Sequence, residues 1–331
     1  MKKGIYVYGV IKTSAPQKFG EIGIGDKASK VFAMGFKDLA AVVSNSPFMI
    51  YDSLAKEKTV KDLVTHQFVI EKVMADFTVI PVKFGTMVET EDEVIKFMEK
   101  GYFVLRNALR RMEGKIELDV VASWKLPKIL AMIYAEDRRV QKKQQEIALK
   151  GDKATVEDKV ALGKLIEQAL NTRKVRNSRL ILKTLKKEAG EICLHDLTGD
   201  EMVFNAAFLI KASAKKLFYK VLDELDQSFE DTLNFRLVGP LPSYSFSTIL
   251  FKRISPKEVE KAKKTLGLNG EITDKTVSHA YRQLAQVHHP DKNTSQGQLK
   301  FALINSAYRV LKDFTEKGFF DVDIYHWEGG R

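Results

Sequence analysis

The chain has 331 residues, a length for which two or three domains are expected. Hydrophobic residues make up 44% of it and charged residues 29%, which excludes a collagen-like, low-complexity or wholly disordered chain. The net charge is +11, and the excess lies mostly in 127–190, which holds 16 basic and 8 acidic residues. A basic region of this kind points to an acidic partner or to nucleic acid.

The single cysteine, Cys193, excludes an internal disulfide and a cysteine-based zinc site, which favours a reducing compartment. The opening sequence MKKGIYVYGVIK predicts a strand and not a signal peptide, because Gly4 and Gly9 interrupt its apolar run. No run approaches the roughly 18 apolar residues that a membrane-spanning helix needs. We therefore expect a cytoplasmic protein with no membrane partner.

Residues 1–126 are predicted to form the first domain. The hydrophobic pattern predicts, in order, a strand at 5–11, a hairpin around 35–38, a helix at 59–77, a strand at 79–87, a helix at 91–112 and a strand at 117–126. An acidic first turn and Gly114 mark the two ends of the second helix. This order favours an α+β fold with a ferredoxin-like α/β sandwich.

Residues 127–254 are predicted to form a second, helical plus α+β domain. As far as about Lys187 the sequence is charged and almost free of Gly and Pro, which predicts two or three helices with a turn near Gly151. A strand at 202–213, a helix at 215–233 and two strand pieces at 234–251 follow. The composition becomes helical and polar after Pro256, so the third predicted domain is 255–331.

Two amphipathic helices are predicted in this third domain. Apolar residues recur along each helix at spacings of 3 and 4, so the two stripes can face each other in an antiparallel hairpin. The expected hairpin core is Tyr281, Leu284, Phe301, Ile304, Tyr308 and Leu311. Pro290 cannot continue the first helix, so the tip of the hairpin displays His289, Pro290, Asp291 and Lys292.

This part of the sequence resembles a DnaJ-type J domain, an all-α domain with a His-Pro-Asp tripeptide between two such helices. The matching segments are KKTLGL at 263–268, AYRQLAQVHHPDKN at 280–293 and FALINSAYRVLKD at 301–313. The resemblance implies docking onto a DnaK-type ATPase chaperone. Asp291 would pair there with an arginine of the chaperone, while Arg282 and Lys292 add charge at the rim. The alternative is a helix that a proline ends beside an incidental aspartate.

The preceding 254 residues resemble the gas vesicle GvpF/GvpL family. The resemblance is carried by His66 and by four strings: IYVYGVI at 5–11, VIPVKFGTM at 79–87, FNAAFLIKAS at 204–213 and VGPLPSYSFSTI at 238–249. It implies an accessory protein of gas vesicle formation that contacts the small hydrophobic shell protein. Other accessory proteins of the gas vesicle are further expected partners.

The stretch 171–187 holds seven basic residues and no acidic one. Nonspecific binding of nucleic acid is one interpretation, but the stretch lacks aromatic residues on which bases could stack. The other interpretation of this stretch is a solvated helix face or a surface for an acidic partner. An acidic group at 223–231 leaves self-association open. The candidate partner surface consists of Arg173, Lys174, Arg176, Arg179 and Lys183.

Catalysis is not expected. His66 and Lys83 are polar residues of the first domain, but no nucleophile or carboxylate pair accompanies them, and no phosphate-binding or metal-binding motif is present. We therefore expect no cofactor and no metal, and assign ATP to the chaperone. The leading hypothesis is a co-chaperone of gas vesicle assembly. The alternatives are a minor structural component of the vesicle shell or nucleus, and a nucleic-acid-binding protein.

Overall fold

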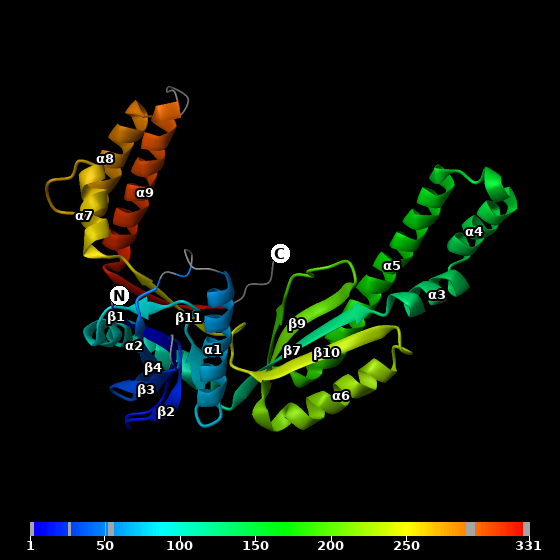
Figure 1. Cartoon of the computed structure of the whole chain (residues 1–331), viewed down its shortest axis with the longest axis horizontal. Coiled ribbons are helices and arrows are strands. Elements are labelled where there is room, and N and C mark those ends of the chain that lie inside the picture. The colour runs from blue at the N-terminus through cyan, green and yellow to red at the C-terminus, as the bar shows by residue number, and fades with distance from the viewer. Residues whose placement is uncertain (1–2, 26–27, 50, 52–55, 289–294, 327–331) are drawn as a thin grey trace. The chain divides into compact units, whose positions relative to one another are not determined.

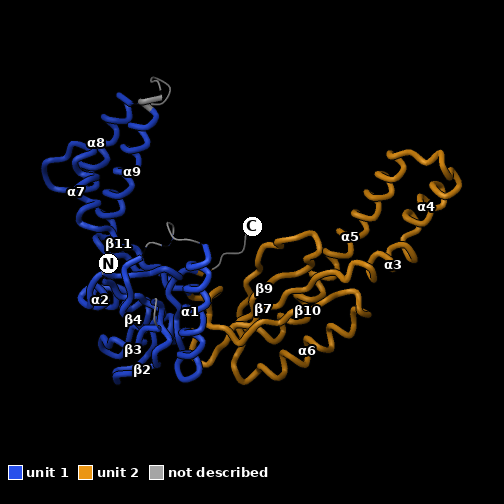
Figure 2. Tube along the Cα trace, in the orientation of Figure 1, with its two compact units in different colours: residues 1–110, 248–325 blue, residues 111–247, 326–331 orange. Residues whose placement is uncertain are grey.

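The computed structural model describes residues 3–25, 28–49, 51, 56–288 and 295–326, except for the side chains of 295–297. Its contacts divide the chain into two compact units (Figure 2). Unit 1 combines residues 1–110 with 248–325, and unit 2 combines 111–247 with 326–331. This grouping differs from the three consecutive domains expected from the sequence, because the chain leaves unit 1 after its second helix and later returns to it.

The first part of unit 1 is an antiparallel sheet with two helices (Figure 1). The strand order is β2-β3-β4-β1-β5, and β6 also pairs with β1. The predicted hairpin around Gly35–Asp38 is confirmed, since Phe36 pairs with Leu39. The elements are β1 (Lys3–Ile11), β2 (Lys18–Gly23), β3 (Ser29–Phe36), β4 (Leu39–Pro47), α1 (Lys56–Met74), β5 (Val79–Pro81), β6 (Met87–Val88) and α2 (Glu91–Met112).

Helix α1 carries apolar residues on two faces. Val69, Ile70 and Val73 are buried, as expected for a helix that covers a sheet. Other apolar positions that helped to predict this helix are exposed instead: Val60, Leu63, Val64 and Phe68. The buried face holds the polar side chains of Asp62 and His66. Periodicity therefore identified the helix but not the face that packs on the sheet.

Unit 2 contains a four-stranded antiparallel sheet in the order β10-β7-β9-β8. Strand β7 is the strand that the sequence placed at the end of the first domain, and that prediction is wrong: it pairs with β9 and β10. Its residues Leu118, Val120 and Ala122 pack in one hydrophobic core with helices α5 and α6. The elements are β7 (Lys115–Trp124), α3 (Leu126–Glu136), α4 (Arg138–Lys150), α5 (Val156–Leu185), β8 (Glu191–Leu194), β9 (Met202–Lys211), α6 (Lys215–Gln227) and β10 (Leu233–Leu241).

The last part of unit 1 is a three-helix group between two strands. The helices pack on one another through a core that includes Val259, Val277 and Leu311. The two strands pair over their whole length, from Thr248 opposite Tyr325 to Arg253 opposite Phe320. The second of these strands was not predicted from the sequence. The elements are β11 (Thr248–Arg253), α7 (Pro256–Thr265), α8 (Asp274–Val287), α9 (Ser295–Lys317) and β12 (Phe320–Tyr325).

The β11–β12 ribbon, residues 248–253 and 320–325, docks on the first part of unit 1. Ile249 bridges to Val82 beside β5, and its carbonyl accepts a hydrogen bond from the backbone N–H of Lys83. Phe251 packs between Phe97 of α2, at a ring-centroid distance of 5.1 Å, and Phe320, at 5.9 Å. The ribbon thus joins both ends of the helical group to the same surface.

Gly101 of α2 lies where β12 comes closest. A Cβ atom at this position would lie 2.7 Å from a methyl carbon of Val322 and 2.9 Å from one of Leu105. Both distances are shorter than carbon atoms tolerate, and the β-branched Val322 has little freedom to turn away. The absence of a side chain at 101 is therefore a condition for the docking of β12.

We expect Gly101→Ala to lower the free energy of local opening of β12 by about 1–2 kcal/mol, because overpacking costs about 1–3 kcal/mol and the better helix propensity of alanine returns at most about 1. Hydrogen exchange of the amides of 320–325 measures this. Gly163 is the matched control, a glycine inside α5 with open space around it. Gly163→Ala should leave β12 unchanged, and equal protection of β12 in both variants would contradict the docking described here.

Candidate functional site

The helical hairpin of α8 and α9 has an aromatic and aliphatic interior. The rings of Tyr281 and Tyr308 stack at 4.2 Å, and the Tyr281 hydroxyl donates a hydrogen bond to Asn305 at 2.7 Å. Ile304 and Leu311 are buried, whereas Leu284 is partly buried against the same core. Phe301, the remaining residue of the predicted core, is also partly buried.

The two ends of α8 are defined locally. Thr273 forms a capping box with Thr276 at its start, and Asp274 of the first turn pairs with Lys312 of α9. At its other end, the N–H of His288 donates to the carbonyl of Leu284. Helix α7 contributes Val259, Ala262 and Leu266 to the same core. The hairpin core predicted from the sequence did not include these three residues.

Among the predicted docking residues, Arg282 lies on the exposed side of α8. His289, Pro290, Asp291 and Lys292 lie outside the described residues. The structure therefore describes the helices on both sides of the tripeptide, whereas the display of the tripeptide at the tip and its role in docking stay predictions from the sequence.

The basic stretch lies on α5, and its five cations have different surroundings. Arg173 forms an ion pair with Glu136 of α3 at 2.9 Å, and Lys174 lines a cavity with Trp124. Of the five candidate residues, Arg176, Arg179 and Lys183 are exposed, whereas Arg173 and Lys174 are partly buried.

A buried polar group in unit 1 surrounds His66. The Tyr6 hydroxyl lies 3.0 Å from His66 Nδ1 and accepts a hydrogen bond from the Gly85 N–H at 2.9 Å. The Tyr51 hydroxyl donates to Asp62, another buried residue of α1, at 3.1 Å. Burial lowers the pKa of His66 to about 4, so the imidazole is neutral at neutral pH. These bonds connect α1 to β1 and to the Gly85 turn.

A second buried polar group lies in unit 2, on the face of β7 opposite Leu118. Glu117 is 1% exposed, and its carboxylate accepts hydrogen bonds from the N–H of Ser245 at 2.9 Å and from its hydroxyl at 2.8 Å. The same hydroxyl lies 3.3 Å from His195 Nε2. Asp119, two residues along β7, lies within hydrogen-bonding distance of Glu117. Spacing alone places both carboxyl groups on one face of a strand, but the sequence did not show that this face is buried.

The two carboxyl groups hold a proton more tightly than isolated ones. Burial raises the pKa of Glu117, and the charge of Asp119 raises it further. Burial likewise raises the pKa of Asp119, while His195 opposes this shift. Two carboxylates side by side in a buried place repel each other, so the pair shares a proton at neutral pH. Cys193 is buried nearby, and burial raises the pKa of its thiol to about 12.

Neither polar group has the arrangement of a recognisable active site. In the part of the chain that the structure describes, no group of three metal-ligating side chains is close enough to hold an ion. Ser245 donates to Glu117 instead of being activated by it, and the His66 group contains no nucleophile. Within the described ranges, no helix is long and apolar enough to cross a membrane.

The fold and the hairpin define a two-unit α+β protein with a helical J-type hairpin. Over residues 4–248, the chain belongs to the gas vesicle synthesis protein GvpL/GvpF family. Residues 264–321 match the DnaJ domain. Both resemblances drawn from the sequence are confirmed, as is the α+β class.

The relatives agree with this assignment. The chain is 29% identical to gas vesicle protein F from a Streptomyces species, over 73% of this chain and 98% of that one. It is 26% identical to the same protein from a Nostoc species, over 75% of this chain and all of that one. The hairpin region is 44% identical over 68 residues to a DnaJ homologue from Caenorhabditis elegans, covering 20% of this chain and 14% of that one.

Solved structures share the fold. The crystal structure of GvpF from an Anabaena species matches with a TM-score of 0.59 and 24% identity, over 73% of this chain and 97% of that one. The crystal structure of GvpF from Microcystis aeruginosa matches with a TM-score of 0.56 and 24% identity, over 73% of this chain and 98% of that one.

The two family matches together place the partners of the chain, in general terms, among gas vesicle proteins and DnaK-type chaperones.

The shared proton of Glu117 and Asp119 makes a pH-dependent contribution to stability. A carboxyl group whose pKa is raised on folding contributes stability at low pH and loses it as pH rises through the folded value. We expect the wild-type protein to lose stability between about pH 5 and about pH 9 from this source. Asp119→Asn, which removes the like charge and keeps a donor for Glu117, should make this slope shallower and add about 1–2 kcal/mol at the high-pH end, while the part of the slope that comes from the burial of Glu117 remains.

Urea unfolding of unit 2 as a function of pH, followed by hydrogen exchange of the β7 and β9 amides, measures this effect. Asp226→Asn on the exposed side of α6 is the control and should leave the slope unchanged. A slope in Asp119→Asn as steep as that of the wild type would contradict the shared proton.

Proposed function

We propose that this chain is a non-enzymatic assembly factor of gas vesicles, which binds the small hydrophobic shell protein and recruits a DnaK-type chaperone through its J hairpin. The observation that carries the proposal is the presence of a GvpL/GvpF module and a DnaJ domain in one chain. The family membership supports a place at the gas vesicle, and the hairpin supports an accessory role beside an ATP-hydrolysing partner.

The physical reason for combining the two modules is the solubility of the client. A shell protein that presents an apolar surface to gas exposes that surface before assembly, where it promotes aggregation in water. A protein that holds the client and also binds a chaperone makes the encounter of the two nearly intramolecular. The bound client then meets the bound chaperone at a high effective concentration, instead of by diffusion of the two through solution.

The β11–β12 ribbon supports this arrangement. Strand β11 ends at Arg253 and α7 begins at Pro256, and β12 returns to the same ribbon after α9. The J hairpin is therefore joined to the first part of unit 1, through the ribbon, by short connections at both ends. A chaperone bound to the hairpin would stay close to unit 1, unlike one bound through a long flexible linker.

Asp291 is expected to be needed for stimulation of the ATPase. In the full chain, Asp291→Asn should reduce stimulation of a DnaK-type chaperone by at least about tenfold, because it removes the carboxylate of a charge-assisted pair. Single-turnover ATP hydrolysis measures this. Asp223→Asn on the exposed side of α6 is the matched control and should retain full stimulation. Equal stimulation by all three proteins, or by none of them, would contradict chaperone recruitment.

Client binding is tested by co-expression of the full chain with the shell protein. We expect the soluble fraction of the shell protein to be larger with the wild-type chain than when the shell protein is expressed alone, because a bound partner covers its apolar surface. An equal soluble fraction in both cases would contradict client binding. A truncation after residue 254 is a poor reagent, because it would remove β12 from its pairing with β11. Stoichiometric retention of the chain in washed vesicles would contradict the holder and favour a structural component of the shell.

A further inference from the structure

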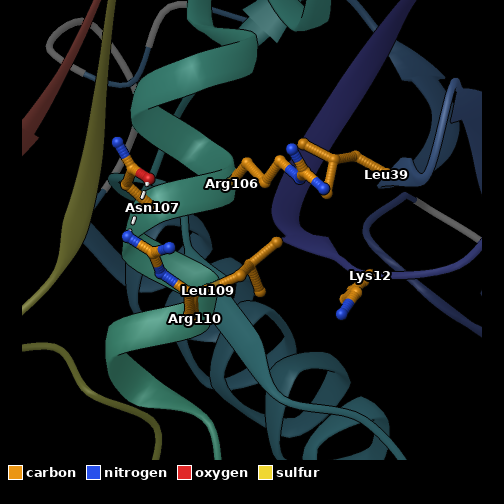
Figure 3. A pocket seen from close by; sticks show the side chains of 6 residues that line it. All are labelled: Lys12, Leu39, Arg106, Asn107, Leu109 and Arg110. Atoms are coloured by element: carbon orange, nitrogen blue, oxygen red, sulfur yellow. Dashed lines mark hydrogen bonds between the residues drawn. The ribbon is translucent and has the colours of Figure 1, made fainter.

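Helix α2 and the end of β1 enclose a small pocket in unit 1 (Figure 3). Its volume is about 160 Å³, and it is lined by Lys12, Leu39, Arg106, Asn107, Leu109 and Arg110. Arg106 extends from α2 towards Leu39, Arg110 turns towards Asn107, and Lys12 lies across from both on the β1 side. Three cations therefore border one opening, which no proposed role of the GvpL/GvpF module or the J hairpin uses.

The base of the pocket is apolar. Leu39 is 0% exposed and Leu109 is 3% exposed, whereas the three cationic side chains are exposed. A charged group that enters would contact hydrocarbon on one side and cations at the rim. Its attraction to those cations is then stronger than on an open, fully solvated surface.

One carboxylate, that of Asp38, lies beside the pocket, and two neighbouring side chains already contact it. Asp38 accepts a hydrogen bond from the Tyr102 hydroxyl at 2.6 Å and pairs with Nε of Arg106 at 3.2 Å. The donation from Tyr102 lowers the pKa of Asp38, and Arg106 and Lys12 lower it further, so this carboxylate stays ionised. The contact holds Arg106 through Nε and leaves its two terminal amino groups as donors.

The other two cations lack carboxylate partners. Within the described ranges, no Asp or Glu lies within ion-pair distance of Lys12 or Arg110, and the only contact of this kind at Arg106 is the one to Asp38. The Arg110 guanidinium donates instead to Asn107, at 3.4 Å. Three positive charges against one negative charge leave the pocket with an excess of two, so the group that complements it is an anion.

An exposed aromatic side chain adjoins the pocket. Phe103 is 76% exposed and lies three residues before Arg106 and seven before Arg110, on the same face of α2. Val104 beside it is 42% exposed. Arginine and phenylalanine are both enriched in protein interfaces, where an aromatic anchor next to a charged contact is a common pattern.

We propose that Phe103, Arg106, Arg110 and Lys12 form a docking site for an acidic amphipathic segment of a protein partner. A Glu or Asp carboxylate of that segment enters the pocket between the cations, and an apolar side chain one turn away covers Phe103. A nucleic acid would need a row of cations along its phosphates, and a free phosphate would leave Phe103 without a partner. The site depends neither on the shell protein nor on the chaperone.

The test uses the full chain and a fluorescent synthetic helical peptide of about 15 residues made of Glu, Leu and Ala. Fluorescence anisotropy measures its affinity. The double variant Arg106→Gln/Arg110→Gln should bind about tenfold more weakly, as expected from the loss of one charge-assisted pair, and Phe103→Ser should bind several-fold more weakly. Lys257→Gln/Lys264→Gln removes two exposed charges on α7, away from this face of α2, and should stay within about twofold.

Three further measurements decide between ligand classes. The same peptide with Gln in place of Glu should bind at least about tenfold more weakly, and neither inorganic phosphate nor a single-stranded oligonucleotide should displace the acidic peptide. Equal losses in the two double variants would overturn the proposal, since they would show attraction to net charge alone. Unchanged binding by Phe103→Ser, or displacement by phosphate or the oligonucleotide, would overturn it as well.

Discussion

The pairing of β11 with β12 is the constraint on which the arrangement of unit 1 depends. These strands precede and follow the three-helix group, and their six residue pairs close a loop that contains α7, α8 and α9. Arg253 at the end of β11 pairs with Glu89 at 2.8 Å and with Glu93 at 2.9 Å, at the start of α2. Both carboxylates are less than a third exposed, so these charge pairs are better shielded from water than ordinary surface pairs.

The ribbon gives the J hairpin a different kind of attachment from that of a domain at the end of a linker. A domain joined at one end can sample many orientations, whereas one joined at both ends loses most of that freedom. Lys252 of β11 also pairs with Asp313 of α9, so the ribbon contacts the hairpin through a side chain as well as through the backbone. Under the proposed function, a chaperone bound to the hairpin would therefore stay within a limited range of distances from the first part of unit 1.

The two buried polar groups have structural roles that their chemistry explains. Neutral His66 and Tyr6 share a hydrogen bond that connects a helix to a sheet, and the Tyr6 hydroxyl also accepts one from the Gly85 N–H. Glu117 receives both donors of Ser245, which ties the segment after β10 to β7. A buried carboxylate without such donors would be costly, so these bonds explain how an acidic residue is accommodated inside the sheet. By residue type alone, both groups resemble catalytic sites. Their hydrogen bonds instead hold neighbouring elements of the fold together, which is a structural role.

Local patterns determined much of this protein. The spacing of apolar residues identified α1, α2, α8 and α9, and Gly151 marked the turn between α4 and α5, because these features depend on neighbours along one helix. The tertiary structure alone decided that β7 belongs to the second sheet, that β12 pairs with β11, and that Phe103 stays exposed beside three cations. Each of these depends on contacts between residues far apart in the chain, which amphipathic periodicity does not encode.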